Sequence, residues 1–192
     1  MKKILILLIL LLFPVLATAS PFGLKMGMSI KEIEKVCTTK PVYVKDDIYL
    51  IKPKKNHPLF ESYLVLVDNS KGLYQIRAVS SLVSTNRYGT ELRNTFDDVK
   101  NRVSKTYGVP YVIDEVDSKS IYKENDEWLY ALKEGARTLA AVWGRDEPLK
   151  DHVTLISLEC NSDKGTLQKG YLILYYYFEN ANKIEDEQDS VF

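Results

Sequence analysis

Two cysteines, Cys37 and Cys160, have the chemistry that is easiest to state, because a pair of thiols can form a disulfide, hold a metal or supply a nucleophile. The chain has no Cys-x-x-Cys motif, and neither cysteine has a histidine close to it, so a redox-active or metal-binding pair is disfavoured. In an oxidising compartment an even cysteine count predicts a structural disulfide. We therefore expect a Cys37–Cys160 disulfide, worth roughly 4–5 kcal/mol for so long a loop. Two buried free thiols are the alternative.

The first nineteen residues indicate such a compartment. Lys2-Lys3 precedes an aliphatic run over residues 4–12, and the small residues Ala17-Thr18-Ala19 follow, which is the pattern of a signal peptide. The run is too short for a membrane span, and no cysteine follows it directly to carry a lipid. We expect cleavage after Ala19 and a soluble periplasmic or secreted protein, without stable membrane insertion once the signal peptide is removed.

Other residues with catalytic chemistry are sparse. The two histidines, His57 and His152, are isolated from each other and from the cysteines, so no zinc-binding spacing exists. Nucleophile elbows, phosphate loops and dinucleotide loops are absent from the sequence. Asp97 and Asp98 are adjacent at a predicted helix start, where they complement the helix dipole. We expect no enzyme activity, no cofactor and no metal site.

The charge balance excludes a further class of partner. Without Lys2 and Lys3 the 26 basic residues fall to 24, against 26 acidic residues, so the net charge of the cleaved chain is about −2. A nearly neutral surface gives no long-range attraction toward nucleic acid or anionic lipid. We therefore expect no nucleic-acid partner.

Three groups of residues are candidates for contact with a partner. Trp143 and Arg145 lie where a predicted strand runs into a loop, and a tryptophan there could anchor an interface, with core packing as the alternative. The run Tyr175–Phe178 could stack on a sugar or peptide, although strand alternation directs much of it into the core. A basic loop could meet an acidic partner or be merely solvated; its lysines are Lys45, Lys52, Lys54 and Lys55.

The elements that must position these residues fall into two similar groups. In the first, Ser29 and Glu32 form a capping box that predicts a helix ending near Cys37. Turn signals at Asp46-Asp47 and at 69–72 separate strands. Four strands are expected, over residues 42–45, 48–52, 60–68 and 73–81.

In the second group a helix begins near Thr90 or Thr95 and ends at Gly108, with Pro110 beyond. Alternation along a later strand directs Cys160 into the core. The last strand is apolar on both sides, so it is expected either in the centre of a sheet or covered on both faces. The remaining expected elements are a strand over 111–116, a short helix over 125–133, and strands over 138–143, 152–160 and 170–178.

This order predicts an α+β fold in which antiparallel sheet is covered by two or three helices, arranged as a degenerate two-fold repeat of a helix-plus-sheet unit. The predicted boundaries are a signal peptide over 1–19, a first half over 20–89, a second half over 90–179 and a frayed acidic tail over 180–192. The pattern leaves open whether the two halves share one sheet.

The opening of the first helix carries a resemblance. Gly27-Met28-Ser29 followed by Glu32-Ile33 and Val36 is similar to the opening of small envelope proteins of the SmpA/OmlA type and of β-lactamase-inhibitory-protein-like modules. Tyr107-Gly108-Val109-Pro110 resembles the end of the helix in such modules. The longer motif from Phe22 to Ser29 is most similar to a class of uncharacterised secreted bacterial proteins. The resemblance implies helices laid on antiparallel sheet and a role in binding other proteins.

Export, a two-unit fold, an expected disulfide and no catalytic motif together favour a protein that binds another envelope protein, as an inhibitor, an immunity protein or an assembly accessory. The alternatives are a small-ligand or glycan-binding protein, with or without weak hydrolase activity, and a structural or stress-response protein with no single partner. A closed aromatic pocket with convergent carboxylates would favour ligand binding, and an exposed flat aromatic patch would favour protein binding. The sequence does not indicate an oligomeric state.

Overall fold

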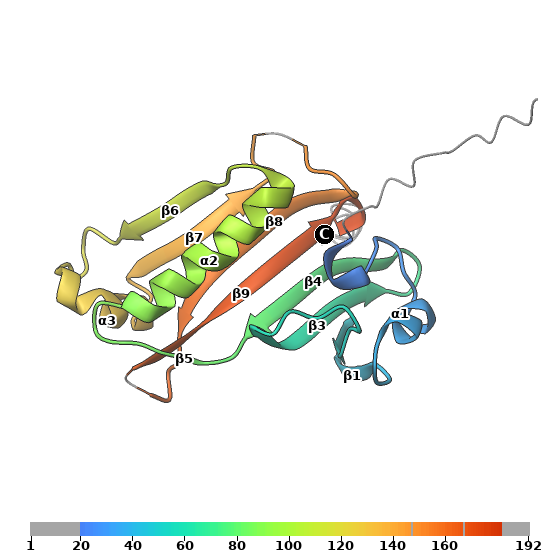
Figure 1. Ribbon diagram of the computed structural model, residues 1–192, viewed down its shortest axis with the longest axis horizontal. Coiled ribbons are helices and arrows are strands. Elements are labelled where there is room, and N and C mark those ends of the chain that lie inside the picture. Colours follow the sequence, from blue (N-terminus) through green and yellow to red (C-terminus); the bar gives the residue numbers. More distant parts are fainter. Residues whose placement is uncertain (1–19, 147, 167, 182–192) are drawn as a thin grey trace, which may run out of the picture.

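The fold is α+β, with the strands in one antiparallel sheet. The structure, a computed structural model, describes residues 20–146, 148–166 and 168–181, so the expected signal peptide and residues 182–192 of the expected tail lie outside it. The strand order is β1-β2-β3-β4-β9-β8-β7-β6, and a short strand, β5, pairs with the beginning of β9 (Figure 1).

The first half begins with a short 3-10 helix and ends with the short strand. Its elements are η1 (Pro21–Gly23), α1 (Ile30–Val36), β1 (Val42–Lys45), β2 (Ile48–Ile51), β3 (Phe60–Asp68), β4 (Gly72–Ser80) and β5 (Val83–Ser84).

The second half contains the longest described helix. Its elements are α2 (Thr90–Tyr107), β6 (Tyr111–Val116), η2 (Asn125–Glu127), α3 (Trp128–Lys133), β7 (Arg137–Trp143), β8 (Val153–Ser162) and β9 (Lys169–Phe178). No helix in the described ranges is long and apolar enough to cross a bilayer.

Local signals explain where the two main helices begin. The predicted capping box at α1 is present, because the Ser29 backbone amide donates to Glu32 Oε2 at 2.8 Å and the Glu32 amide donates to Ser29 Oγ at 3.4 Å. The start of α2 is at Thr90, the earlier of the two predicted positions. Leu92 is fully buried, so it extends the apolar stripe of α2 by one turn toward the N-terminus. The Thr95 hydroxyl donates instead to the Glu91 carbonyl, 2.7 Å away.

The two halves form one sheet, and β4 of the first half meets β9 of the second half at its centre. Residues 75–79 of β4 pair with residues 173–177 of β9, and four strands lie to each side of this junction. The strands of the second half run outward from β9 in reverse chain order, which mirrors the first half. The prediction of a central last strand is therefore confirmed, whereas the two-fold repeat stays a prediction.

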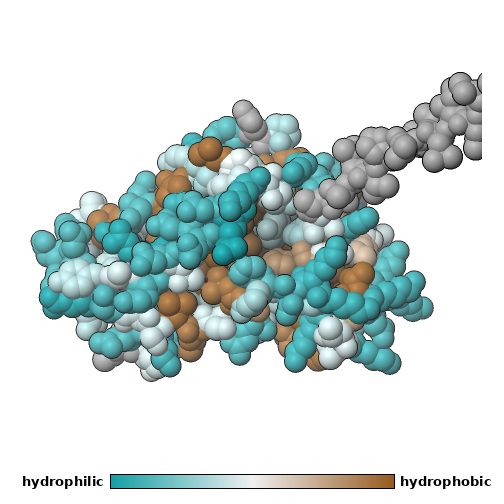
Figure 2. All heavy atoms as spheres, in the orientation of Figure 1, coloured by the Kyte–Doolittle hydropathy of each residue, from teal (hydrophilic) through white to brown (hydrophobic). Residues whose placement is uncertain are grey.

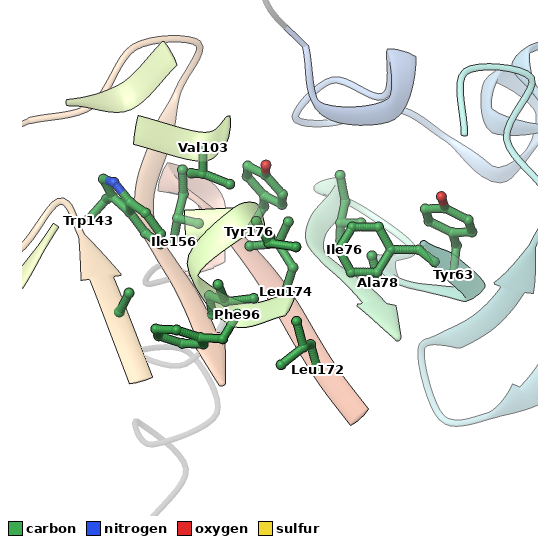
Figure 3. Close-up of a cluster of buried hydrophobic side chains, with 14 of the residues drawn as sticks. Tyr63, Ile76, Ala78, Phe96, Val103, Trp143, Ile156, Leu172, Leu174 and Tyr176 are labelled. Atoms are coloured by element: carbon green, nitrogen blue, oxygen red, sulfur yellow. The ribbon is translucent and has the colours of Figure 1, made fainter. Parts of the chain in front are cut away.

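The core lies between one face of the sheet and a layer formed by α2, α3 and the N-terminal segment, residues 20–28 (Figure 1). Val103 of α2 lies close to Leu174 and Tyr176 of β9, and Ile76, Ala78 and Tyr63 form a second group farther along the sheet (Figure 3). This covered face holds residues with no solvent exposure, among them Ile156, Leu158 and Phe178.

The N-terminal segment is held on the covered face by backbone pairing and by one aromatic side chain. The Gly27 amide donates to the Leu73 carbonyl and the Leu73 amide donates to the Met28 carbonyl, both at 2.9 Å. The Phe22 ring lies edge-on to three other rings, those of Tyr63, Phe60 and Tyr176, at centroid distances of 4.9, 6.0 and 6.1 Å. The segment therefore completes the layer that α2 begins.

The expected disulfide is wrong. Cys37 and Cys160 are both buried free thiols. The backbone of Cys37 forms an isolated antiparallel β-bridge with Pro53, just beyond the end of β2. Cys160 lies on β8, which is four strand spacings from β2 in the sheet. Four spacings amount to about 19 Å, while a disulfide joins Cα atoms less than about 7 Å apart. An even cysteine count says nothing of this separation, because the sheet order decides it.

Thiol titration without reductant is expected to detect both cysteines after unfolding. In the native protein both thiols are expected to react much more slowly than in the unfolded chain. Burial raises the pKa of the Cys160 thiol well above its usual value, and burial also raises the pKa of Cys37, so the reactive thiolates are scarce in the fold. The measurement is reaction with a chromogenic disulfide reagent in buffer and in denaturant. Fewer than two thiols per unfolded chain would contradict the structure.

Candidate functional site

The sheet face opposite α2 carries one row of side chains that crosses all eight strands of the main path. Each member is the register partner of the next, and none of the described helices packs on this face. We call it the open row; its members, from β6 to β1, are Tyr111, Val142, Ser157, Tyr175, Arg77, Leu64, Leu50 and Val42. Alternation along β9 explains its position, because Tyr176 points into the core and Tyr175 therefore points away from it.

The open row is mostly apolar and is reached by solvent along most of its length. Tyr111 is 45% exposed at one end, and Leu50 and Val42 are 38% and 58% exposed at the other. Between them, side chains such as Leu64 and Val142 are half-buried by their neighbours in the sheet. Isolated apolar side chains are normal on protein surfaces, but a contiguous apolar row is a candidate interaction surface.

Tyr175 and Arg77 form the centre of the open row. The Tyr175 ring stacks on the ring of Tyr177, with 6.1 Å between centroids and 22° between planes. The Arg77 guanidinium lies 5.8 Å from the Tyr175 centroid, in the range of a cation–π contact. Its Nε donates to Gln75 Oε1 at 2.6 Å, which fixes the guanidinium. Its two terminal nitrogens have no hydrogen-bond partner among the residues that the structure describes.

Two opposite charges flank Tyr175 and leave the centre nearly neutral. Burial raises the pKa of the Tyr175 hydroxyl, and Glu159 raises it further while Arg77 opposes the shift. The phenol therefore stays protonated at neutral pH and can donate a hydrogen bond. The Glu159 carboxylate accepts a hydrogen bond from the Ser157 hydroxyl at 2.9 Å, so it already has a partner within the sheet.

Of the sequence-predicted residues, Trp143 lies in the core and Arg145 lies at the surface. Trp143 is 1% exposed, and its Nε1 donates to the Gly108 carbonyl at 2.9 Å. Trp143 is therefore a core residue. The Arg145 guanidinium lies 4.1 Å from the centroid of the Tyr111 ring, at the end of the open row. The Arg145 Nε is also 3.8 Å from Asp146 Oδ1. The structure thus brings Arg145 to the open row and keeps Trp143 away from it.

The predicted basic loop has structural contacts of its own. Lys52, Lys54 and Lys55 are all exposed. The Lys54 ammonium donates to the Lys35 carbonyl at 2.8 Å, where a cation complements the last turn of α1. The stem of Lys55 packs over Gly23 of the N-terminal segment. Two of the three lysines therefore help to hold the first half together.

Sequence reasoning missed the pairing of Arg77 with Tyr175. Alternation along β4 puts Arg77 on the face opposite Ile76 and Ala78, and alternation along β9 puts Tyr175 opposite Tyr176. The missing information was that these two strands, almost a hundred residues apart in the chain, are neighbours.

A comparison of the chain with protein-family models, with curated proteins and with solved structures finds no match.

Proposed function

We propose that the protein is a soluble periplasmic binding module, without catalytic activity, that recognises another envelope protein through the open row. The observation that carries the proposal is the row itself, an uncovered, mostly apolar surface with a tyrosine and an arginine at its centre. Tyrosine and arginine are enriched at interfaces and at their energetic centres, where charged residues of other kinds are depleted.

The chemistry of the open row specifies the partner surface. The partner has apolar side chains that cover Leu64, Leu50 and Val42, and a carboxylate that reaches the terminal nitrogens of Arg77. A carboxylate suits this position because a guanidinium presents its donors in a planar fork. Arg77 is held by Gln75 and Tyr175 before the partner arrives, so little side-chain entropy is lost on binding.

The proposal also covers the compartment in which the protein acts and the way in which the wide sheet arose. The signal-peptide pattern over residues 1–19 supports export, and the opening motif at Ser29 supports a kinship with secreted binding modules. The mirrored strand order of the two halves supports a degenerate repeat of a helix-plus-sheet unit. Two such units side by side give a sheet face that the eight strands of the main path cross.

Affinity capture with tagged protein beginning at Ser20 tests the proposal. Wild type is expected to recover one dominant partner from envelope extract in near-equal amount. Tyr175→Thr and Arg77→Met are each expected to recover at least about tenfold less of this partner than wild type does. The matched control is Tyr130→Ala, because Tyr130 is exposed and stacks on Tyr122 at 6.2 Å and 24°, much as Tyr175 stacks on Tyr177. Thermal unfolding checks that all variants are folded.

Two results would overturn the proposal. Equal recovery by wild type and both open-row variants would show that the partner binds elsewhere. No recovery by wild type, from an extract in which a known protein pair is captured, would remove the protein partner and direct the search to glycans.

A further inference from the structure

A second candidate site lies on the covered face, where α2 and the N-terminal segment do not quite meet. A recess of about 180 Å³ opens there between α2, β9 and the loop that precedes β3. Figure 2 shows hydrophilic residues over α2 and hydrophobic residues that reach the surface beside it. The recess is on the opposite face from the open row, so any ligand in it leaves the proposed protein interface free.

The walls of the recess are apolar. They are formed by Val99 and Val103 of α2, Leu174 and Tyr176 of β9, and the rings of Phe22 and Phe60. Figure 3 shows Val103 of α2 close to Leu174 and Tyr176 of β9. A dry cavity of about 150 Å³ accommodates benzene. The recess therefore has room for an apolar group about the size of one aromatic ring.

The rim of the recess is polar and carries a positive charge. Arg102 lies there beside His57 and Thr106, and no acidic side chain is among the lining residues. Within the described part of the chain, no ion pair involves Arg102. An exposed guanidinium without a carboxylate, placed over an apolar recess, is complementary to an anionic head on an apolar body.

His57 supplies a neutral donor to the same rim. Its Nδ1 accepts a hydrogen bond from the Leu59 amide at 3.2 Å, so the proton of the neutral ring is on Nε2. Burial and the neighbouring Arg102 lower the pKa of His57, so the ring is neutral at pH 7. The Tyr63 hydroxyl accepts from the His57 amide at 2.9 Å, which holds this loop in place.

Backbone strain adjoins the recess. Phe22 has φ of 55°, in the left-handed region that bulky residues rarely adopt. Residues held in this region concentrate at ligand clamps and active sites, where the surrounding contacts maintain them. At Phe22 the strain directs an aromatic ring into the wall of the recess, next to the ring of Tyr176.

We propose that this recess binds a small monocarboxylate whose apolar body is about the size of one aromatic ring. The body lies against Val103, Leu174 and Phe22, and the carboxylate accepts hydrogen bonds from the Arg102 guanidinium and from His57 Nε2. The proposal does not depend on the protein partner, because it uses the opposite face of the sheet.

Titration calorimetry with 3-phenylpropionate, and with its neutral amide as a second probe, tests the proposal. Wild type is expected to bind the carboxylate with a dissociation constant below about 1 mM and the amide about tenfold more weakly. Arg102→Gln is expected to bind the carboxylate about tenfold more weakly while its affinity for the amide is unchanged. Lys105→Gln is the matched control, since Lys105 is an exposed cation on the same helix that does not line the recess.

Methyl NMR shifts locate the bound probe, with the methyl groups of Val103 and Leu174 expected to move. Absence of saturable binding below 10 mM would overturn the proposal. Equal affinity for carboxylate and amide, or an equal loss in Arg102→Gln and Lys105→Gln, would also overturn it, because either result removes the role of the rim cation. Capture of an envelope protein is unaffected by these outcomes, so this proposal and the proposed function fail separately.

Discussion

Replacement of Trp143 by alanine is expected to lower the free energy of unfolding by about 3–5 kcal/mol. The indole is almost fully buried on the covered face, where Trp143 pairs with the fully buried Ile156. Its Nε1 donates to the carbonyl of Gly108, the residue that ends α2, so the ring joins the end of the helix to β7. The substitution removes this hydrogen bond and leaves a cavity that a rigid sheet cannot fill.

The measurement is urea unfolding followed by far-UV circular dichroism. Trp143→Phe is expected to lower the free energy of unfolding by less than Trp143→Ala does, because phenylalanine keeps most of the apolar volume. It still loses the indole hydrogen bond. Val109→Ala is the control, since Val109 is 94% exposed and adjoins Gly108; it should change the free energy of unfolding by less than about 0.5 kcal/mol. A loss below about 1 kcal/mol for Trp143→Ala would place the ring outside the core and make it an interface candidate again.

Replacement of Gly89 by alanine is expected to cost about 2–5 kcal/mol of unfolding free energy, the sum of two effects. Gly89 precedes α2 with φ of +69°, where a side chain costs roughly 1–2 kcal/mol. A Cβ there would also lie 2.2 Å from Cε3 of Trp128, and overpacking of a tight site costs about 1–3 kcal/mol more. The Trp128 ring cannot move aside easily, because it is buried and the guanidinium groups of Arg93 and Arg137 lie 5.6 and 5.8 Å from it.

Gly135→Ala separates these two effects. Gly135 has nearly the same backbone angle, φ of +72°, but nothing lies within 4 Å of the position that its Cβ would take. Gly135→Ala is therefore expected to lower the free energy of unfolding only by the cost of the backbone conformation, about 1–2 kcal/mol. Thermal unfolding of the two variants side by side is the measurement. Equal losses would show that Trp128 does not pack against Gly89 as the structure has it.

Local signals in the sequence were sufficient where the chain contacts itself over a few residues. The Ser29–Glu32 capping box predicts the start of α1 correctly because both partners lie within one helical turn. The turn signal at residues 69–72 predicts β3 with its observed bounds, Phe60–Asp68, and predicts most of β4. The η2 and α3 pair was predicted as one helix over 125–133, and the structure divides it into a 3-10 turn over Asn125–Glu127 and an α-helix that begins at Trp128.

The same signals were insufficient wherever the answer depended on which strands are neighbours. Cys37 and Cys160 satisfied the counting rule for a disulfide, but Cys37 lies beside the end of β2, and β3, β4 and β9 separate β2 from β8, which carries Cys160. Trp143 was ambiguous between core and interface, since a tryptophan at the end of a strand suits both. The β7–β8 register and the end of α2 place it in the core.

By itself the sequence determined the types of element, most of their bounds and the α+β class, because capping, turn chemistry and apolar periodicity act between residues close in the chain. Only the tertiary structure decided that β4 pairs with β9, and this pairing joins the halves into one sheet and brings Arg77 over Tyr175. It also decided that α2 and the N-terminal segment cover one face and leave a recess between them. The reason is physical: a strand offers the same backbone hydrogen bonds to any neighbour, so packing across the whole chain selects the partner.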